Sequence, residues 1–272
     1  MLQLSGVDQP SFELPGGTRM PVLGLGVWQL AAGRETERAV EWALEAGYRH
    51  VDTASMYHNE ASVGAAVRRS DLPRDDVFVT TKLMPTHASA ARELDKSLKR
   101  LGFDYVDLYL IHWPIPGVTT RYWRQLQELR DGGLAKEVGV SNFGVSTLER
   151  LQQRGSSLVP AVNQIQFSPF QYRSRLLDYC LRHGIVFEAY SPLARGRVTD
   201  PAIVAIAQRL GRTAAQVMLR WAVQHQAVVI PKSSDRERIR SNAQIFDFEL
   251  GDEDMRALDA LDRTNGSAEA RR

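Results

Sequence analysis

The sequence predicts a (β/α)8 TIM barrel of the α/β class, with an N-terminal β-hairpin and two extra helices. Short β-branched runs alternate with stretches of helical spacing from about residue 35 to residue 245. The chain has 272 residues, close to the roughly 250 that are typical of this fold. Polar residues also follow the apolar runs, at the strand ends where barrels of this kind carry their functional groups.

The expected elements follow from hydrophobic spacing. The strands are apolar runs rich in β-branched residues, at 22–26, 48–52, 77–83, 106–112, 137–141, 161–166, 185–190 and 227–231. The helices have apolar residues at helical spacing, at 35–46, 59–69, 88–101, 121–131, 145–154, 174–183, 213–224 and 236–244. A Gly-Gly turn in 11–20 predicts a hairpin that closes the bottom of the barrel, and 201–210 and 252–262 predict the extra helices. Because no linker rich in Pro, Gly or Ser interrupts the chain, we expect one domain over residues 1–272.

Composition and charge narrow the class of protein. The chain is 43% hydrophobic, and its 34 Lys+Arg nearly balance its 32 Asp+Glu without a long basic run, which argues against a nucleic-acid partner. No apolar stretch approaches the roughly 20 residues needed to cross a bilayer, and the N-terminus lacks a signal-peptide pattern. The single cysteine, Cys180, cannot form an internal disulfide. We therefore expect a cytoplasmic monomer with a small-molecule partner and no membrane partner.

Polar residues stand at thirty-residue intervals, each at the end of an apolar run: Asp52, Lys82, His112 and Asn142. Thirty residues is about the length of one strand–helix repeat, so these side chains should surround one point at the strand ends. The series continues less regularly through Gln164, Tyr190 and Lys232. This ring of polar groups indicates an active site.

Several segments together resemble the aldo-keto reductase family over nearly the whole chain. They are GLGVW (24–28), GYRHVDTASMYHNEASVG (47–64), TTKL (80–83), VDLYLIHWP (106–114), GVSNF (139–143), NQIQFSP (163–169), YSPLARG (190–196) and IPKSSDRERIRSNAQIFDFEL (230–250). The chain is most similar in appearance to short bacterial members such as diketo-gluconate reductases. The resemblance implies a reductase of aldehydes, ketones or small dicarbonyls that uses NADPH. It also implies a catalytic tetrad, formed by Asp52, Tyr57, Lys82 and His112.

The chemistry of these four residue types suits carbonyl reduction, which needs an acid and donors that stabilise charge on oxygen. A free phenol such as that of Tyr57 has a pKa of about 10, and the ammonium of Lys82 should lower that pKa by stabilising the phenolate. Asp52 can keep Lys82 charged, and His112 can share a hydrogen bond with the carbonyl oxygen. Each residue alone also has a structural explanation, such as helix capping or core packing. The spacing of all four favours catalysis.

The resemblance also implies residues that bind NADPH or NADP+. Ser141, Asn142 and Gln164 have amide and hydroxyl groups suited to the nicotinamide carboxamide, and Tyr190 can stack on the ring. A Rossmann loop is excluded, because Gly24-Leu-Gly26 lacks the third glycine of that motif. The remaining cofactor positions lie in 191–197 and 231–242, which offer hydroxyls, backbone amides and cations: Ser191, Leu193, Lys232, Ser233, Arg238 and Asn242. Of these, Lys232, Ser233 and Arg238 match the family positions for the 2′-phosphate. Without the resemblance to the family, the segment 231–242 would be interpreted as a solvent-exposed helix start.

An apolar wall is expected for the substrate. Trp28, Trp113 and Phe143 would flank Tyr57 and His112, which suits aldehydes and ketones, although core packing also explains such aromatic residues. The loops are short and the C-terminal tail lacks an aromatic ending, so we expect an open pocket.

Two other functions fit parts of this pattern. One is a redox-sensing regulatory subunit that binds NADPH with slow turnover, because the same fold and cofactor site occur in subunits of potassium channels. The other is a barrel hydrolase or lyase that uses Asp52 and His112 without a cofactor. The histidines show no ligand-like pairing and no HExxH or CxxC motif occurs, so no metal is expected. The complete tetrad favours the reductase.

Overall fold

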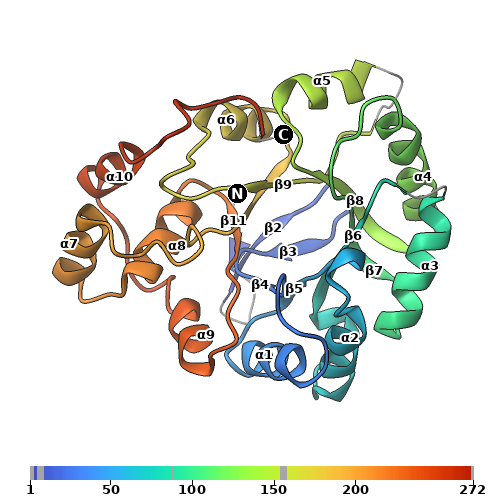
Figure 1. The fold of residues 1–272 in the computed structure, drawn as a ribbon, viewed down its shortest axis with the longest axis horizontal. Helices are drawn as coiled ribbons and strands as arrows, with labels where there is room; N and C mark the ends of the chain where they lie inside the picture. The colour runs from blue at the N-terminus through green and yellow to red at the C-terminus, as the bar shows by residue number, and fades with distance from the viewer. Residues whose placement is uncertain (1–2, 5–8, 87–88, 154–157, 271–272) are drawn as a thin grey trace.

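The computed structural model describes residues 3–4, 9–86, 89–153 and 158–270. Eight parallel strands form one sheet, and Figure 1 shows the helices arranged around it. In sheet order the strands are β4 (Leu25–Gly26), β5 (His50–Asp52), β6 (Phe78–Leu83), β7 (Val106–Ile111), β8 (Ala135–Ser141), β9 (Val162–Gln166), β10 (Val186–Tyr190) and β11 (Val228–Ile230). All eight lie within or overlap the predicted runs, which confirms the barrel. The first two strands are shorter than predicted.

The sheet closes between its first and last strands. Leu23 forms a parallel bridge with Val229, and the amide of Gly24 donates to the carbonyl oxygen of Val229 at 2.9 Å. A Cβ atom on Gly26 would lie 2.8 Å from the carbonyl oxygen of Ile230, so only glycine allows this close approach. The short β4 is therefore the place where the barrel closes.

Several helices carry the start and stop signals that their sequences predict. Ser89 caps α3 by accepting from the amide of Arg92, and Gly102 ends that helix with a φ of 69°. Thr213 and Gln216 form a capping box at the start of α8. The helices are α1 (Arg34–Glu45), α2 (Glu60–Arg69), α3 (Ala90–Leu101), α4 (Thr119–Asp131), α5 (Val145–Gln153), α6 (Ser174–Arg182), α7 (Pro201–Leu210), α8 (Ala214–Gln224), α9 (Arg236–Ala243) and α10 (Asp252–Asp259). Of these, α7 and α10 are the two extra helices. Positions 88 and 154, where two helices were expected to begin and end, lie outside the described residues.

The hairpin closes the N-terminal end of the barrel, as expected. It consists of β2 (Pro10–Glu13) and β3 (Arg19–Pro21), and β1 (Gln3–Leu4) adds a third strand that was not predicted. Leu14 and Met20 of the hairpin are buried in one cluster with side chains of the barrel interior: Phe78, Leu108, Leu110, Val162 and Val228. This cluster fills the lower part of the barrel with apolar groups.

The barrel interior changes from apolar to polar toward the C-terminal ends of the strands. Side chains alternate along a strand, so residues two apart share a face. The cluster around Leu14 and Met20 is called the apolar plug below. On the strand face that carries this plug, the next positions along the strands are buried and polar: His50, Asp52, Thr80, Lys82, Gln164 and Glu188. The alternate residues, such as Val51, Ile165 and Ala189, pack in the larger core that also contains helix residues. A polar layer therefore lies above the apolar plug, and it holds the candidate site.

Among the described residues, no helix is both long enough and apolar enough to cross a membrane.

Candidate active site

The structure brings the predicted tetrad together at the C-terminal ends of three neighbouring strands. Asp52 is the last residue of β5, Lys82 lies near the end of β6, and His112 follows β7. Tyr57 ends a 3-10 turn (Ser55–Tyr57) in the connection after β5. This connection is anchored by Asn59, which accepts from Thr53 Oγ1 at 2.9 Å and donates to two carbonyl oxygens in the loop after β4.

Lys82 is the centre of the cluster. Its Nζ lies 2.6 and 2.7 Å from the two carboxylate oxygens of Asp52 and 2.9 Å from the carbonyl oxygen of Thr53. The hydroxyl of Tyr57 lies 3.4 Å from the same nitrogen. Lys82 has no exposed surface, and a buried ammonium is stable only when its hydrogen bonds are made. Asp52 therefore both neutralises Lys82 and holds it against the phenol.

The protonation states follow from burial and from this ion pair. Burial disfavours charge on Lys82, but the nearby acidic groups, with Asp52 first and Tyr57 and Glu188 after it, together outweigh burial and raise the pKa of Lys82 above its ordinary value. Burial also raises the pKa of the Tyr57 phenol, and Lys82 opposes this shift without cancelling it. The expected net lowering of the Tyr57 pKa was therefore wrong for the ligand-free protein, because desolvation of the phenolate dominates. Tyr57 consequently holds its proton at neutral pH.

His112 is a neutral imidazole. Burial, followed by the positive charge of Lys82, lowers the pKa of His112 to about 3. Its ring meets the ring of Tyr57 edge-on, with centroids 5.7 Å apart, and stacks at 6.4 Å with Trp113. Nδ1 of His112 has no hydrogen-bond partner among the described residues. A neutral histidine beside the phenol can donate one N–H without adding charge to the site.

The residues predicted for the nicotinamide form a second cluster beside the tetrad. Asn142 Nδ2 donates to the carbonyl oxygen of His112 at 3.1 Å and to Ser141 Oγ at 3.0 Å. Tyr190 Oη donates to Asn142 Oδ1 at 2.9 Å, and Gln164 Nε2 donates to Asp52 Oδ2 at 2.8 Å. Asn142 has a φ of 63°, a left-handed conformation that asparagine tolerates better than most residues. Amide and hydroxyl groups that suit a carboxamide are thus gathered within one hydrogen-bonded group.

The predicted phosphate-binding residues lie at the same end of the barrel. The loop after β10 has left-handed backbone at Ser191, Ala194 and Arg195, and the half-buried Leu193 lies within it. Lys232 follows β11 and is exposed, as is Arg238 in the first turn of α9. These cations and the helix start fit a phosphate group. The nearby Ser233 and Asn242 are buried.

Ser233 differs from the expectation of a free phosphate donor. Its hydroxyl accepts from the amide of Asp235 at 3.1 Å and donates to the carbonyl oxygen of the same residue at 3.4 Å. In the ligand-free protein Ser233 therefore shapes the turn before α9.

The aromatic residues of the expected substrate wall behave differently from one another. Trp28 is 39% exposed, and the guanidinium of Arg195 lies over its ring at 5.7 Å, which joins the loops after β4 and β10. Trp113 is half-buried beside His112. Phe143 has no exposed surface and packs in the hydrophobic core, so its predicted place in the wall was wrong. Phe143 instead packs in the core next to the site and contributes to its stability.

A groove of about 830 Å³ reaches Trp113 and Asn142, which both contact His112 of the tetrad. It is lined by residues of 113–120 and 142–151 and by Glu269 and Ala270 of the C-terminal tail. Backbone amides of α5 hold this tail, because Val145 donates to the carbonyl oxygen of Ala268 at 2.9 Å and Ser146 to Glu269 Oε1 at 3.1 Å. Sequence reasoning missed this wall, because the tail has no motif and its contact is more than 100 residues away in the chain.

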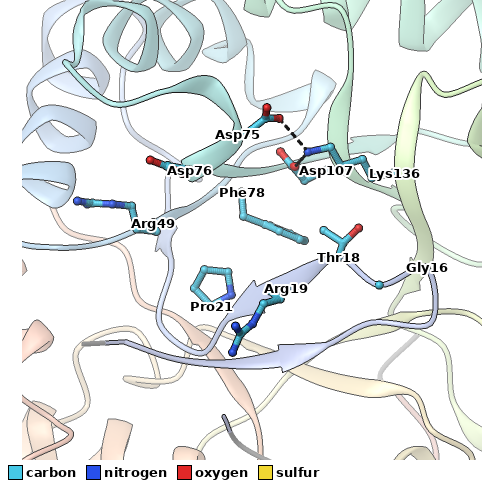
Figure 2. A pocket seen from close by; sticks show the side chains of 11 residues that line it. Gly16, Thr18, Arg19, Pro21, Arg49, Asp75, Asp76, Phe78, Asp107 and Lys136 are labelled. Atoms are coloured by element: carbon cyan, nitrogen blue, oxygen red, sulfur yellow. Dashed lines mark hydrogen bonds and ion pairs between the residues drawn. The ribbon is translucent and has the colours of Figure 1, made fainter. Parts of the chain in front are cut away.

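A hollow of about 380 Å³ lies at the opposite end, between the hairpin and the strand starts (Figure 2). Three of its charged groups are in ion pairs: Lys136 Nζ lies 3.2 Å from both Asp75 and Asp107, and Asp107 also lies 2.8 Å from Arg74. Functional groups of such barrels lie at the C-terminal face, so these ion pairs are best assigned to stability. The tetrad end is the candidate active site.

The fold and this site define a (β/α)8-barrel oxidoreductase, and comparisons with known proteins give its family. A model of the aldo/keto reductase family matches residues 22–263. An aldo-keto reductase of Mycolicibacterium smegmatis is 47% identical over 262 residues, which cover 93% of this chain and 91% of that protein. A glyoxal reductase of Bacillus subtilis is 42% identical over 255 residues, with 92% of each protein covered.

A solved structure agrees with the sequence comparisons. The crystal structure of an aldo/keto reductase from Brucella melitensis has a TM-score of 0.89 and 42% identity, and the match covers 93% of this chain and 100% of that one. The chain belongs to the aldo-keto reductase family, and it is an oxidoreductase that acts on carbonyl compounds with a nicotinamide cofactor. The nearer resemblance to diketo-gluconate reductases stays a prediction.

Proposed function

We propose that this protein is an NADPH-dependent reductase of aldehydes, ketones and small dicarbonyls, in which Tyr57 is the general acid. The observation that carries the proposal is the position of Lys82 Nζ, which contacts both the Asp52 carboxylate and the Tyr57 hydroxyl. A protonated phenol, a buried ammonium and a neutral imidazole then face one place. This set provides a proton and hydrogen bonds for a carbonyl oxygen that gains negative charge.

When bound, the nicotinamide supplies the hydride for the carbonyl carbon. Tyr57 donates its proton to the carbonyl oxygen, and Lys82 stabilises the phenolate that this transfer leaves. Asp52 keeps Lys82 charged and oriented throughout. The neutral imidazole of His112 donates a hydrogen bond to the same carbonyl oxygen and orients the substrate.

The donor set supports binding of NADPH. Ser141, Asn142 and Gln164 would hold the nicotinamide carboxamide, and the ring would lie against Tyr190. The other cofactor contacts that we propose come from the loop after β10 and from α9: Ser191, Leu193, Lys232, Ser233, Arg238 and Asn242. The exposed cations Lys232 and Arg238 favour NADPH, because only that nucleotide carries a 2′-phosphate.

The substrate class follows from the surfaces next to the tetrad. Trp28 and Trp113 present aromatic surface, which favours aldehydes and ketones with an apolar part. The similarity to a glyoxal reductase supports small dicarbonyls as well. All tetrad residues come from one chain, which agrees with a monomer as the active form.

The test is Tyr57→Phe, with Tyr105→Phe as the matched control. Tyr105 lies at the other end of the barrel, where its hydroxyl donates to Asp75. Tyr57→Phe should keep the dissociation constant for NADPH, measured by quenching of tryptophan fluorescence, and lose about 10²–10⁴-fold in carbonyl reduction. The control should keep both. If Tyr57→Phe keeps more than about half of the wild-type turnover while chemistry limits the rate, Tyr57 is not the acid.

The same assays separate the reductase from the regulatory subunit. A wild-type protein that binds NADPH but turns over no member of a panel of aldehydes, ketones and dicarbonyls would contradict the reductase and favour the regulatory function.

A further inference from the structure

Glu188 is a fully buried carboxyl group next to the tetrad, and the chemistry above does not use it. It lies on β10 directly opposite Gln164 of β9 in the sheet register, and it has no exposed surface. Gln164 Nε2 donates to Glu188 Oε2 at 2.8 Å and to Asp52 Oδ2 at 2.8 Å. One amide group therefore joins two carboxyl groups, of which one belongs to the tetrad.

This double contact determines the orientation of the Gln164 side chain. A primary amide has two N–H donors, and both are engaged here. The flipped amide would turn its oxygen toward the ionised carboxylate of Asp52, which is unfavourable for an acceptor. The amide oxygen is then the one polar atom of this side chain that is left to bind a ligand.

We propose that Glu188 is a positioning residue: together with Asp52 it holds both N–H groups of Gln164, so that only the amide oxygen is presented to the nicotinamide carboxamide. This inference rests on the proposed function, because it assigns Gln164 to the nicotinamide. It adds a residue of the barrel interior that acts through Gln164 and does not touch the cofactor.

The charges around Glu188 determine its protonation state. Toward β5, its Oε1 lies 3.6 Å from Nε2 of His50, whose pKa burial lowers to about 3, so that His50 is neutral. Asp52 of β5 and Lys82 of β6 also face it and already neutralise each other. The strands on either side present Gln164 and Val228, neither of which titrates.

Burial, with the negative charge of Asp52 second, raises the pKa of Glu188 to about 8. At neutral pH Glu188 is therefore protonated, and together with neutral His50 and the Lys82–Asp52 pair it leaves the layer without net charge. Ionisation above that pKa adds a buried negative charge that raises the pKa of Tyr57 and weakens its acidity. Because this charge acts on Tyr57 directly, the carboxyl group of Glu188 at this place also has a signature in the pH dependence of reduction, which a residue packed elsewhere in the barrel would lack.

The experiment compares Glu188→Gln with Glu188→Leu. The glutamine keeps an acceptor for Gln164 but cannot ionise, whereas the leucine removes the acceptor. One hydrogen bond contributes about 0.5–1.5 kcal/mol, so its loss in Glu188→Leu should weaken NADPH binding by about three- to tenfold. Glu188→Gln should restore most of that affinity. Wild-type turnover should fall as pH rises through about 8, and in Glu188→Gln this fall should move to higher pH.

The matched control is Glu137→Gln, which neutralises a buried glutamate at the hairpin end, where the amide of Gly16 donates to it at 2.7 Å. This variant should leave the affinity and the pH profile unchanged. A readout without turnover is the infrared band of a protonated carboxyl group in the cofactor-free protein. That band should be present at neutral pH, disappear as pH rises through about 8, and be absent in Glu188→Gln.

The outcomes separate this inference from the proposed function. Equal NADPH affinity in the leucine and glutamine variants overturns the positioning of Gln164 by Glu188, and an unchanged pH profile in Glu188→Gln overturns the protonated state assigned to Glu188. In both cases the reductase stands. NADPH binding without any turnover overturns the reductase, and the contrast between the two variants in affinity still decides the role of Glu188. A wild type that binds no NADPH overturns both.

Discussion

Lys82 has no contact with solvent, and its charge is retained because oxygen atoms surround its Nζ. The desolvation of an isolated ammonium would cost several kcal/mol, and the hydrogen bonds to Asp52 and Thr53 offset that cost. The same geometry brings the charge within 3.4 Å of the Tyr57 hydroxyl. One residue therefore links the stability of the barrel interior to the acidity of the phenol.

We predict that Lys82→Met cuts carbonyl reduction and moves its alkaline pH limb to higher pH, because the phenolate of Tyr57 loses its stabilising charge. The free energy of unfolding should also fall by about 3–5 kcal/mol, because the buried charge of Asp52 loses its cationic partner. Lys136→Met, which removes a lysine paired with Asp75 and Asp107 at the other end of the barrel, should leave the pH profile unchanged. A folded Lys82→Met protein with the wild-type profile would contradict electrostatic activation of Tyr57.

At the scale of elements, the residues proposed to bind the cofactor lie on short segments that follow neighbouring strands. The loop after β10 contributes left-handed backbone at Ser191 and Ala194, and the loop after β11 leads into α9. Asp235 caps α9 by accepting from the amide of Arg238 at 2.9 Å. The cap fixes where the helix starts and keeps the Arg238 side chain in its first turn, at the surface.

We predict that Arg238→Ala weakens NADPH binding by about ten- to a hundredfold and leaves NADH binding nearly unchanged, because hydrogen bonds from a charged donor contribute about 1.5–3 kcal/mol. Arg240→Ala, which removes an exposed arginine from the last turn of the same helix, is the control and should affect neither nucleotide. Dissociation constants would be measured by tryptophan fluorescence quenching at fixed salt. Equal weakening for the two nucleotides would place Arg238 outside the 2′-phosphate site.

At the scale of the whole molecule, the polar layer of the barrel holds groups whose neutral forms are favoured. Burial lowers the pKa of His50 and His112 from 6.5 to about 3. For such bases the stabilisation is present above the unfolded pKa and is lost as pH falls toward the folded pKa. Burial raises the pKa of Glu188 from 4.5 to about 8, so its stabilisation is present below 4.5 and is lost as pH rises through about 8.

We therefore predict that stability falls on both sides of a maximum. Of these three groups, only Glu188 makes stability depend on pH above pH 6.5, so the free energy of unfolding should decrease from there to about pH 8. Below pH 4.5, of these three groups only the histidines make stability depend on pH, and stability should decrease as pH falls toward 3. Denaturant unfolding at a series of pH values measures both slopes.

Single substitutions show which residue causes each of the two slopes of the free energy of unfolding against pH. Glu188→Gln should flatten the alkaline side, and His112→Asn should reduce the acid slope. His183→Asn, at an exposed position, is the control for both. An alkaline slope that survives in Glu188→Gln would mean that another buried group ionises there.

Much of the architecture could be predicted from the sequence, because strand and helix periodicities are local properties of the chain. The runs around VFVTTK and VDLYLIH became β6 and β7, and the polar residues at their ends, Lys82 and His112, lie together as expected. Parallel strands separated by one helix each bring their C-terminal ends to one face. Thirty-residue spacing is therefore enough to predict which residues meet.

The tertiary structure alone decided how each group behaves at that face. The pKa of Tyr57 is raised, Phe143 lies in the core, and the tail residue Glu269 lines the groove, although no local pattern indicates any of these. Glu188 was overlooked for the same reason, since its importance comes from Gln164 and Asp52 on other strands. Periodicity determines which face of a strand a residue occupies. Desolvation and the interaction between charges depend on atoms that only folding brings within a few ångströms.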